Sequence, residues 1–298
     1  YKKAAMLCGI GSDNLVAVPC DETGAMIPSE LEAAVGEALA SGALPFFVGA
    51  TAGTTVTGAF DPFHEIADVC ERHGLYMHVD GAWGAAVLLS GRGDRRALMD
   101  GAERADSLTW NAHKLMGMPL QCSAFLTATP GALEACNGTR ASYLFQPDKL
   151  HAEYDLGDKT IQCGRRADAY KLWMTWKALG DAGFAARVDH CCDLARGSGG
   201  AFVMAKPRTF ANVCFWYVPP SLRPWDPAAA GEEARRRMAS VAPAIKAKMQ
   251  RRGLAMIGFQ PLDGMPNFFR IVFPSCLNTT KADLDRLLDA IEEIGSNQ

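Results

Sequence analysis

The sequence predicts an α/β fold, in which helices flank a mostly parallel sheet, followed by a small α+β carboxyl-terminal domain. Short apolar runs bounded by turn residues alternate with helical patterns in the first part of the chain, which is typical of a parallel sheet covered on both faces. After Gly197-Ser198-Gly199-Gly200 the character changes to a compact set of strands and helices. We therefore expect a large domain at residues 1–195 and a small domain at residues 196–298.

Helix-end residues and short apolar runs give the elements of the first domain. Pro28 suits the first turn of a helix, Asp61 suits the amino-terminal cap of another, and Gly74 suits its end. In a long helix that begins near Ala167, Tyr170, Trp173, Met174 and Leu179 form one apolar stripe. The expected strands are 15–18, 45–50, 75–80, 107–111 and 122–127, and the other expected helices are 2–7, 28–41 and 61–73, with a short helix before residue 103.

The second domain is predicted from the same signals. Its expected strands are 210–218, 255–259 and 268–273, and its expected helices are 231–252 and 280–294, the last capped by Thr279 or Thr280. The clusters Arg235-Arg236-Arg237 and Arg251-Arg252 fall in the first of these helices, where we interpret them as a solvated face.

Composition excludes several classes of protein. The 298 residues are 49% hydrophobic, and their net charge of −3 gives no signal for binding nucleic acid. No apolar run is long enough for a membrane span, and residues 1–6 lack a signal-peptide pattern. The ten cysteines show no zinc-binding spacing, so we expect reduced thiols, no metal and a cytoplasmic location.

The chemistry is suggested by polar residues that follow two of the expected strands. Asp80 closes one strand, and Lys114 follows the next with His113 beside it. Taken singly, the aspartate is typical of a turn, the lysine of a solvated strand end and the histidine of a structural role. Together they lie where open α/β sheets bind ligands. A pyridoxal phosphate enzyme needs an amine to hold the cofactor aldehyde and a carboxylate to keep the pyridine nitrogen protonated, and Lys114 and Asp80 meet those needs.

The chain resembles the group II pyridoxal-phosphate-dependent amino acid decarboxylases, and within them the cysteine sulfinate and glutamate decarboxylases. The resemblance implies a fold-type I transferase-like architecture and pyridoxal 5'-phosphate as cofactor. It rests on the segments Gly53–Pro62, His78–Asp80, Asn111–Lys114, Ser142–Gln146, Gly157–Arg166, Phe215–Arg223 and Asn267–Arg270.

The resemblance also implies a role for each site residue. Lys114 binds the cofactor and later moves protons, and Asp80 pairs with the pyridine nitrogen. Ala82 packs on the ring face, Asn111 and His113 contact the phosphate and ring edge, and Thr55 lies near the phenolic oxygen; for Thr55, hydrogen bonding within its own turn is an equal alternative. Arg270, which follows two phenylalanines, is expected to bind the acidic group of the substrate, with a structural salt bridge as the alternative.

Four departures from the family pattern are visible. Ala112 stands where the family has proline, and Gly81 where it has alanine. The segment 148–155 is shorter than in the family, so His151 takes the place of the loop tyrosine that protonates the substrate carbon; histidine can donate a proton near neutral pH. The stretch 196–208 is shorter by about one helix.

The expected activity is α-decarboxylation of an acidic amino acid, with L-cysteine sulfinate, which gives hypotaurine, ahead of glutamate and aspartate. The altered loop leaves aldehyde formation or transamination as a second hypothesis. A non-catalytic homologue is a third, which the intact Lys114 and Asp80 argue against. By analogy with the family we expect a homodimer, no membrane partner, and an amino-terminal part that this sequence lacks.

Overall fold

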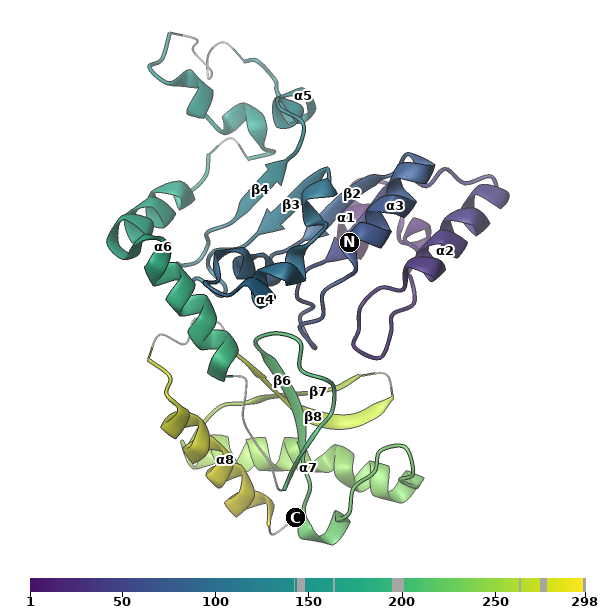
Figure 1. Ribbon diagram of the computed structural model, residues 1–298, viewed down its shortest axis with the longest axis vertical. Helices are drawn as coiled ribbons and strands as arrows, with labels where there is room; N and C mark the ends of the chain where they lie inside the picture. Colours follow the sequence, from purple (N-terminus) through teal and green to yellow (C-terminus); the bar gives the residue numbers. More distant parts are fainter. Residues whose placement is uncertain are drawn as a thin grey trace.

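The computed structural model contains two four-stranded sheets, one above the other in Figure 1. The strand orders are β1-β2-β3-β4 and β5-β6-β8-β7. The structure describes residues 1–141, 143, 148–162, 164–194, 201–262, 264–273 and 278–296. The expected boundary between residues 195 and 196 and most of the segment Ser142–Gln146 lie outside these described residues.

The first sheet confirms the mostly parallel prediction. Strands β1, β2 and β3 run parallel, and β4 pairs with β3 antiparallel. Val48, Ala50, Met77 and Val79 alternate with more exposed residues and bury one face of the sheet against the helices. The strands are β1 Phe47–Thr51, β2 Tyr76–Asp80, β3 Ser107–Trp110 and β4 Ala124–Thr127.

The helices begin and end close to where the sequence signals place them. Helix α3 (Phe63–His73) buries Phe63, Ile66 and Val69, and it ends at Gly74 in the left-handed conformation that favours glycine. The other helices of this part are α1 Lys2–Leu7, α2 Pro28–Ala40, α4 Gly93–Arg96, α5 Ala132–Asn137 and α6 Asp168–Leu194. Short 3-10 turns are η1 Ser12–Asn14, η2 Gly84–Leu89, η3 Ala97–Met99, η4 Ala102–Arg104, η5 Ala152–Tyr154, η6 Gly157–Lys159 and η7 Pro220–Leu222.

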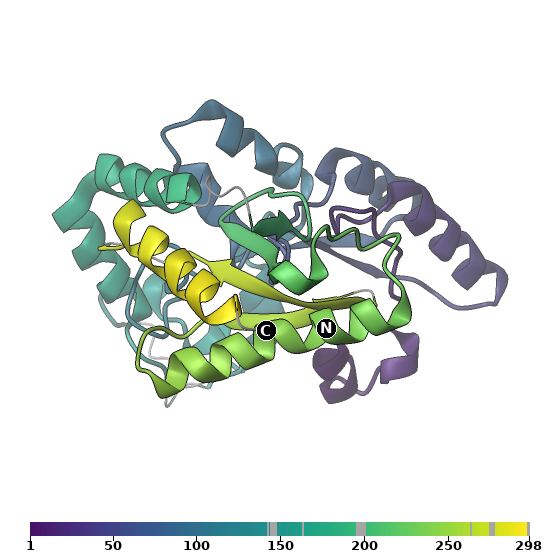
Figure 2. The same ribbon diagram turned by 90° about the horizontal axis from the view of Figure 1, so that it is seen from below.

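The second sheet is antiparallel throughout, as an α+β unit requires. Its strands are β5 Phe202–Met204, β6 Asn212–Tyr217, β7 Gly258–Leu262 and β8 Met265–Val272. Helices α7 (Glu232–Arg251) and α8 (Lys281–Gly295) lie side by side against the strands (Figure 2). Thr280 caps α8 in a reciprocal capping box with Asp283, which confirms one of the two expected caps.

Two expectations about strands are wrong. Residues 15–18 form no strand: Leu15 and Val16 are exposed, and the segment joins neither sheet. Strand β7 begins later than the expected 255–259, because it pairs with β8 through a turn at Gly264, whose φ is 71°. The apolar stripe on α6 is a separate finding: Tyr170, Trp173 and Met174 are exposed within the described part of the chain.

The expected role of Asp61 is also wrong, since its side chain does not cap α3. The carboxylate is 6% exposed and ties two segments together: one oxygen accepts from the backbone N–H of Met26 at 2.7 Å, and the other accepts from that of Thr51 at 2.6 Å. Burial raises the pKa of Asp61. The hydrogen bonds from the two backbone N–H groups lower it, but by less. Asp61 therefore fixes the end of β1, from which one site loop starts.

Asp61→Asn is expected to lower the free energy of unfolding by about 1–3 kcal/mol, because the amide NH₂ would face a backbone N–H and leave it unsatisfied. Urea unfolding measures the change. Asp289→Asn, at an exposed position on α8, is the matched control and should change little. Equal effects of the two substitutions would contradict the role given to Asp61.

Candidate active site

Six of the predicted site residues lie at the carboxyl edge of the first sheet: Thr55, Asp80, Ala82, Asn111, His113 and Lys114. Thr51 of β1 lies beside Asp80 of β2, which lies beside Thr109 of β3. Because these three strands are parallel, the loops that follow them leave from the same edge. The loop after β1 carries Thr55, the turn after β2 carries Ala82, and the turn after β3 carries Asn111, His113 and Lys114.

Asp80 is held by the turn that follows it. Its Oδ1 accepts from the backbone N–H of Ala82 at 3.0 Å, while Oδ2 makes no hydrogen bond with any residue that the structure describes. The carboxylate thus has one oxygen fixed and one available to a ligand. Its charge also acts on its surroundings: burial raises the pKa of the Tyr1 hydroxyl, and the negative charge of Asp80 raises it further.

Lys114 is anchored through its backbone. Its N–H donates to the carbonyl of Asn111 and its own carbonyl accepts from the N–H of Gly117, both at 3.0 Å. Leu115 and Met116 beside it are fully buried, which fixes the turn in the core. The partly buried side chain is different, because Nζ forms no hydrogen bond or ion pair with any described residue. The amine is therefore placed by a rigid turn but not engaged.

His113 is fixed by the segment that precedes β4. Its Nδ1 lies 2.8 Å from the carbonyl oxygen and 3.1 Å from the backbone nitrogen of Cys122, so one of the two hydrogen bonds forms in each tautomer. Nε2 of His113 and the side-chain amide of Asn111 have no partner among the described residues. Both groups can donate to an anionic ligand at this edge.

The three threonines of the loop after β1 differ in their hydrogen bonds. Thr54 Oγ1 and Thr57 Oγ1 lie 2.7 Å apart and both approach the backbone N–H of Ala59, at 3.0 Å and 3.4 Å. These two side chains satisfy the turn. Thr55 is exposed, and its hydroxyl makes no hydrogen bond within the described chain. The alternative that Thr55 satisfies its own turn is therefore not what the structure shows.

Arg270 reaches the site from the second sheet. Its Nη1 donates to the carbonyl of Thr55 at 3.1 Å, and it forms no ion pair with a carboxylate in the part of the chain that is described. The salt bridge considered from sequence is absent there. The guanidinium retains donors for a planar anion next to the loop that carries Thr55.

His151 is not brought to the other site residues. Its side chain is 61% exposed and its backbone has a φ of 59°. The ring stacks on Tyr154 with centroids 5.4 Å apart, and Nδ1 lies 3.3 Å from Glu153. All of these contacts stay within the segment 148–155, so within the described chain the structure leaves His151 apart from Lys114.

Sequence reasoning missed three residues that build this edge. His78 lies on the same face of β2 as Asp80, between the rings of Phe47 and Phe125, and burial lowers its pKa. Trp83 and Asn212 are buried and joined by a hydrogen bond of 2.9 Å. The sequence did carry a signal for His78, because in an alternating strand it lies on the face opposite to the apolar Met77 and Val79. It carried no signal for the hydrogen bond between Trp83 and Asn212, because 129 residues separate the two.

The donor set fits pyridoxal 5'-phosphate. A carboxylate with one open oxygen suits the protonated pyridine nitrogen, an unengaged amine suits the aldehyde, and amide and imidazole donors suit the phosphate. The turn after β2 packs closely against the loop after β1, so that a side chain at Gly84 has no room: its Cβ would lie 2.5 Å from the carbonyl oxygen of Ala52. Asp80, Asn111, His113 and Lys114 would therefore hold the cofactor.

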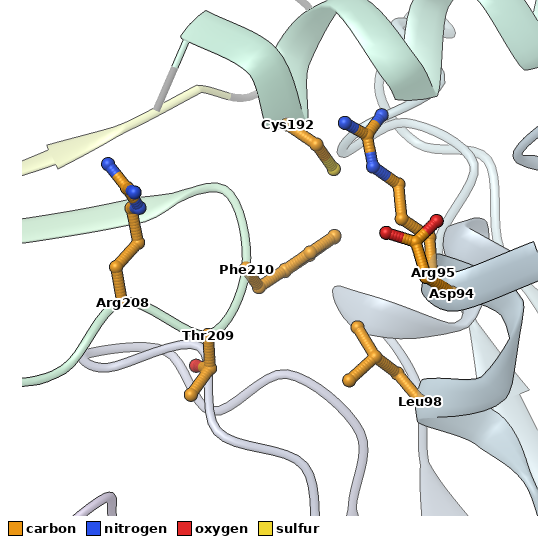
Figure 3. A pocket seen from close by; sticks show the side chains of 7 residues that line it. All are labelled: Asp94, Arg95, Leu98, Cys192, Arg208, Thr209 and Phe210. Atoms are coloured by element: carbon orange, nitrogen blue, oxygen red, sulfur yellow. The ribbon is translucent and has the colours of Figure 1, made fainter. Parts of the chain in front are cut away.

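A cavity of about 380 Å³ lies elsewhere, between α4, α6 and the segment before β6 (Figure 3). Its walls include Arg95, Cys192 and Phe210, and none of the predicted site residues lines it. The guanidinium of Arg95 is 7% exposed and pairs with Asp189 and Asp193. Burial raises the pKa of Cys192 to about 12, so this thiol is a poor nucleophile.

Two kinds of feature are absent from the described residues. None of their helices has the length and apolarity that crossing a membrane would require. Among the same residues, no three histidine, cysteine or acidic side chains are grouped as a metal site would need.

The chain is similar in sequence and in structure to pyridoxal-dependent decarboxylases. Residues 1–218 match the model of the pyridoxal-dependent decarboxylase conserved domain. Human cysteine sulfinic acid decarboxylase is 48% identical over 99% of this chain. The crystal structure of mouse CSAD is similar to the whole chain with a TM-score of 0.92 and 44% identity, and that of Rhodiola rosea 4-hydroxyphenylacetaldehyde synthase is similar to 99% of it with a TM-score of 0.81 and 26% identity. The chain spans 60%, 62% and 59% of these three proteins, respectively.

Proposed function

This chain belongs to the pyridoxal-dependent decarboxylase family, and from that premise we propose that it removes the α-carboxyl group of an acidic amino acid. We propose L-cysteine sulfinate as the preferred substrate, with hypotaurine as product, ahead of glutamate and aspartate. The observation that carries this proposal is the unengaged Lys114 amine at the same sheet edge as the open Asp80 carboxylate, in a chain 48% identical to human cysteine sulfinic acid decarboxylase.

The cofactor of the family is pyridoxal 5'-phosphate, which accepts the electrons that carbon dioxide leaves behind. The residues of this chain divide the remaining work. Lys114 would hold the cofactor through its aldehyde and would move protons once its amine is free. Asp80 would keep a proton on the pyridine nitrogen, because its negative charge favours the protonated ring. Asn111 and His113 would hold the phosphate.

Two further residues shape the space around the ring. Ala82, one residue beyond the tightly packed Gly81, has a side chain small enough to let the cofactor lie against the turn. The hydroxyl of Thr55 is exposed and lacks a described partner, which supports a contact to the phenolic oxygen.

Arg270 supports the preference for an acidic substrate. It lies at the rim of the site, where its bond to the Thr55 carbonyl uses one of five N–H donors. A guanidinium binds a planar or tetrahedral anion through paired donors, which suits a side-chain sulfinate or carboxylate and does not suit an aromatic ring.

On the family likeness of the segment 148–155, we propose His151 as the proton donor to the substrate carbon after decarboxylation; its described contacts stay within that segment, so the role requires it to approach Lys114. His151→Phe is then expected to lower amine formation by about 10²-fold or more, because a general acid contributes on that order. The measurement is the yield of amine and aldehyde per carbon dioxide released. Tyr154→Phe, which keeps the ring that stacks on His151, is the matched control. Unchanged amine formation in His151→Phe would remove His151 from the mechanism.

A homodimer in the cytoplasm is part of the same proposal, on the strength of the family likeness. Sedimentation of the full-length protein measures its oligomeric state.

A substrate panel on the full-length protein with added cofactor tests the function. Carbon dioxide and amine are quantified from cysteine sulfinate, cysteate, aspartate, glutamate and dihydroxyphenylalanine. Stoichiometric amine from the acidic substrates, highest with cysteine sulfinate, is expected. Activity confined to the aromatic substrate would overturn the substrate class, and aldehyde, ammonia and peroxide in place of amine would overturn the reaction.

A further inference from the structure

Asn212 is a buried amide that uses all of its principal hydrogen-bonding groups. It is the first residue of β6 and is 1% exposed. Its Nδ2 donates to the carbonyls of Thr55 and Val56, both at 2.9 Å, and its Oδ1 accepts from Nε1 of Trp83 at 2.9 Å. A single side chain of the second sheet thus holds two loops of the first.

Those two loops are the ones that carry site residues. Thr55 follows β1, and Trp83 directly follows Ala82 in the turn after β2. Other contacts converge on the same places: Arg270 Nη1 also donates to the Thr55 carbonyl, and Cys214 Sγ lies 3.3 Å from the Val56 carbonyl. The Trp83 ring meets that of Phe210, with centroids 5.5 Å apart.

The loops are packed too closely to move independently. A Cβ at Gly53 would lie 2.9 Å from Cα of Gly84 and 3.0 Å from Cδ1 of Trp83. A Cβ at Gly58 would lie 3.3 Å from Cγ of Asn212. Backbone therefore contacts backbone between the loops, and displacement of one loop must shift the other.

We propose that Asn212 is a positioning residue that sets the cofactor-facing geometry of Thr55 and Ala82 together, through the Thr55 carbonyl and the Trp83 indole. This inference rests on the proposed function. It gives the second sheet a part in cofactor affinity, exerted through these two loops. The amide is required, because a carboxylate would set an oxygen against two carbonyl oxygens, and alanine would leave the indole N–H without its acceptor.

The dissociation constant of pyridoxal 5'-phosphate, measured by titration of the full-length cofactor-free protein, tests this inference without turnover. Asn212→Ala and Asn212→Asp are expected to weaken binding by about tenfold or more, as the loss of buried hydrogen bonds implies. Asn267→Ala is the matched control, because the Asn267 amide on β8 donates at 2.8 Å to the carbonyl of Ala239 in α7, and so holds neither of the two site loops. It should lower the thermal midpoint and leave the dissociation constant unchanged.

Trp83→Phe is the second variant, in case the Asn212 substitutions do not fold. It removes the indole N–H and keeps the bonds from Asn212 to the loop, so it should weaken cofactor binding less than Asn212→Ala but measurably. Wild-type affinity in every folded variant of Asn212 and Trp83, or an equal loss in Asn267→Ala, would overturn the inference. A wild type that binds the cofactor but releases no carbon dioxide would overturn the proposed function alone.

Discussion

Lys114→Ala is expected to abolish decarboxylation, with kcat lower by about 10³-fold or more, since the substitution removes the amine that we propose both holds the cofactor and moves protons. It is also expected to leave the thermal midpoint unchanged. Nζ of Lys114 forms no hydrogen bond or ion pair with the described residues, whereas its backbone bonds to Asn111 and Gly117 survive the substitution. The measurements are carbon dioxide release from cysteine sulfinate and thermal unfolding.

Lys171→Ala is the control for this variant. Nζ of Lys171 donates to the carbonyls of Pro119 and Gln121 and lies 3.3 Å from the buried Asp168, so its loss should lower stability and leave the chemistry in place. The two lysines thus separate chemistry from structure within neighbouring segments. Residual activity in Lys114→Ala near the wild-type level would show that another amine binds the cofactor.

Asp80→Asn should have the next largest effect, a fall in kcat of about 10²-fold or more, because a neutral amide cannot hold the proton on the pyridine nitrogen. The substitution is conservative for the fold. The asparagine oxygen can still accept from the Ala82 N–H, which is the hydrogen bond that shapes the turn. We therefore expect normal stability. The effect should fall on kcat more than on KM, since the charge acts on the reaction rather than on substrate binding.

The comparison of Asp80→Asn with Asp80→Ala isolates the charge. Alanine removes the turn hydrogen bond as well, so it should lower both kcat and the thermal midpoint. Steady-state kinetics at saturating cofactor and thermal unfolding of the two variants provide the comparison. If Asp80→Asn retained the wild-type kcat, the carboxylate would have only the structural role of a turn former.

Much of the fold could be predicted because its signals are local. The runs 75–80 and 107–111 are short, apolar and bounded by turn residues, and the structure contains β2 and β3 there. The run 15–18 carries a similar local signal but forms no strand, since a strand also needs a neighbour to pair with. The later start of β7 has the same origin: its bounds depend on pairing with β8.

The same distinction between local signals and tertiary contacts applies to the site. The shared position of Asp80 and Lys114 could be predicted, because the ends of parallel strands meet at one edge whatever the loops do. Which threonine satisfies the loop after β1 could not, since Thr54, Thr55 and Thr57 differ only in where the folded loop points them. The bond between Trp83 and Asn212 likewise depends on contact between the two sheets, which periodicity does not encode.

The proposed function requires that the carboxyl edge of the first sheet hold the cofactor through Lys114. The most direct test is borohydride reduction of the full-length protein with bound cofactor, followed by mass spectrometry of its peptides. The cofactor mass is predicted on the peptide that contains Lys114. Its appearance on Lys159, Lys171 or another lysine, with Lys114 unmodified, would contradict that requirement.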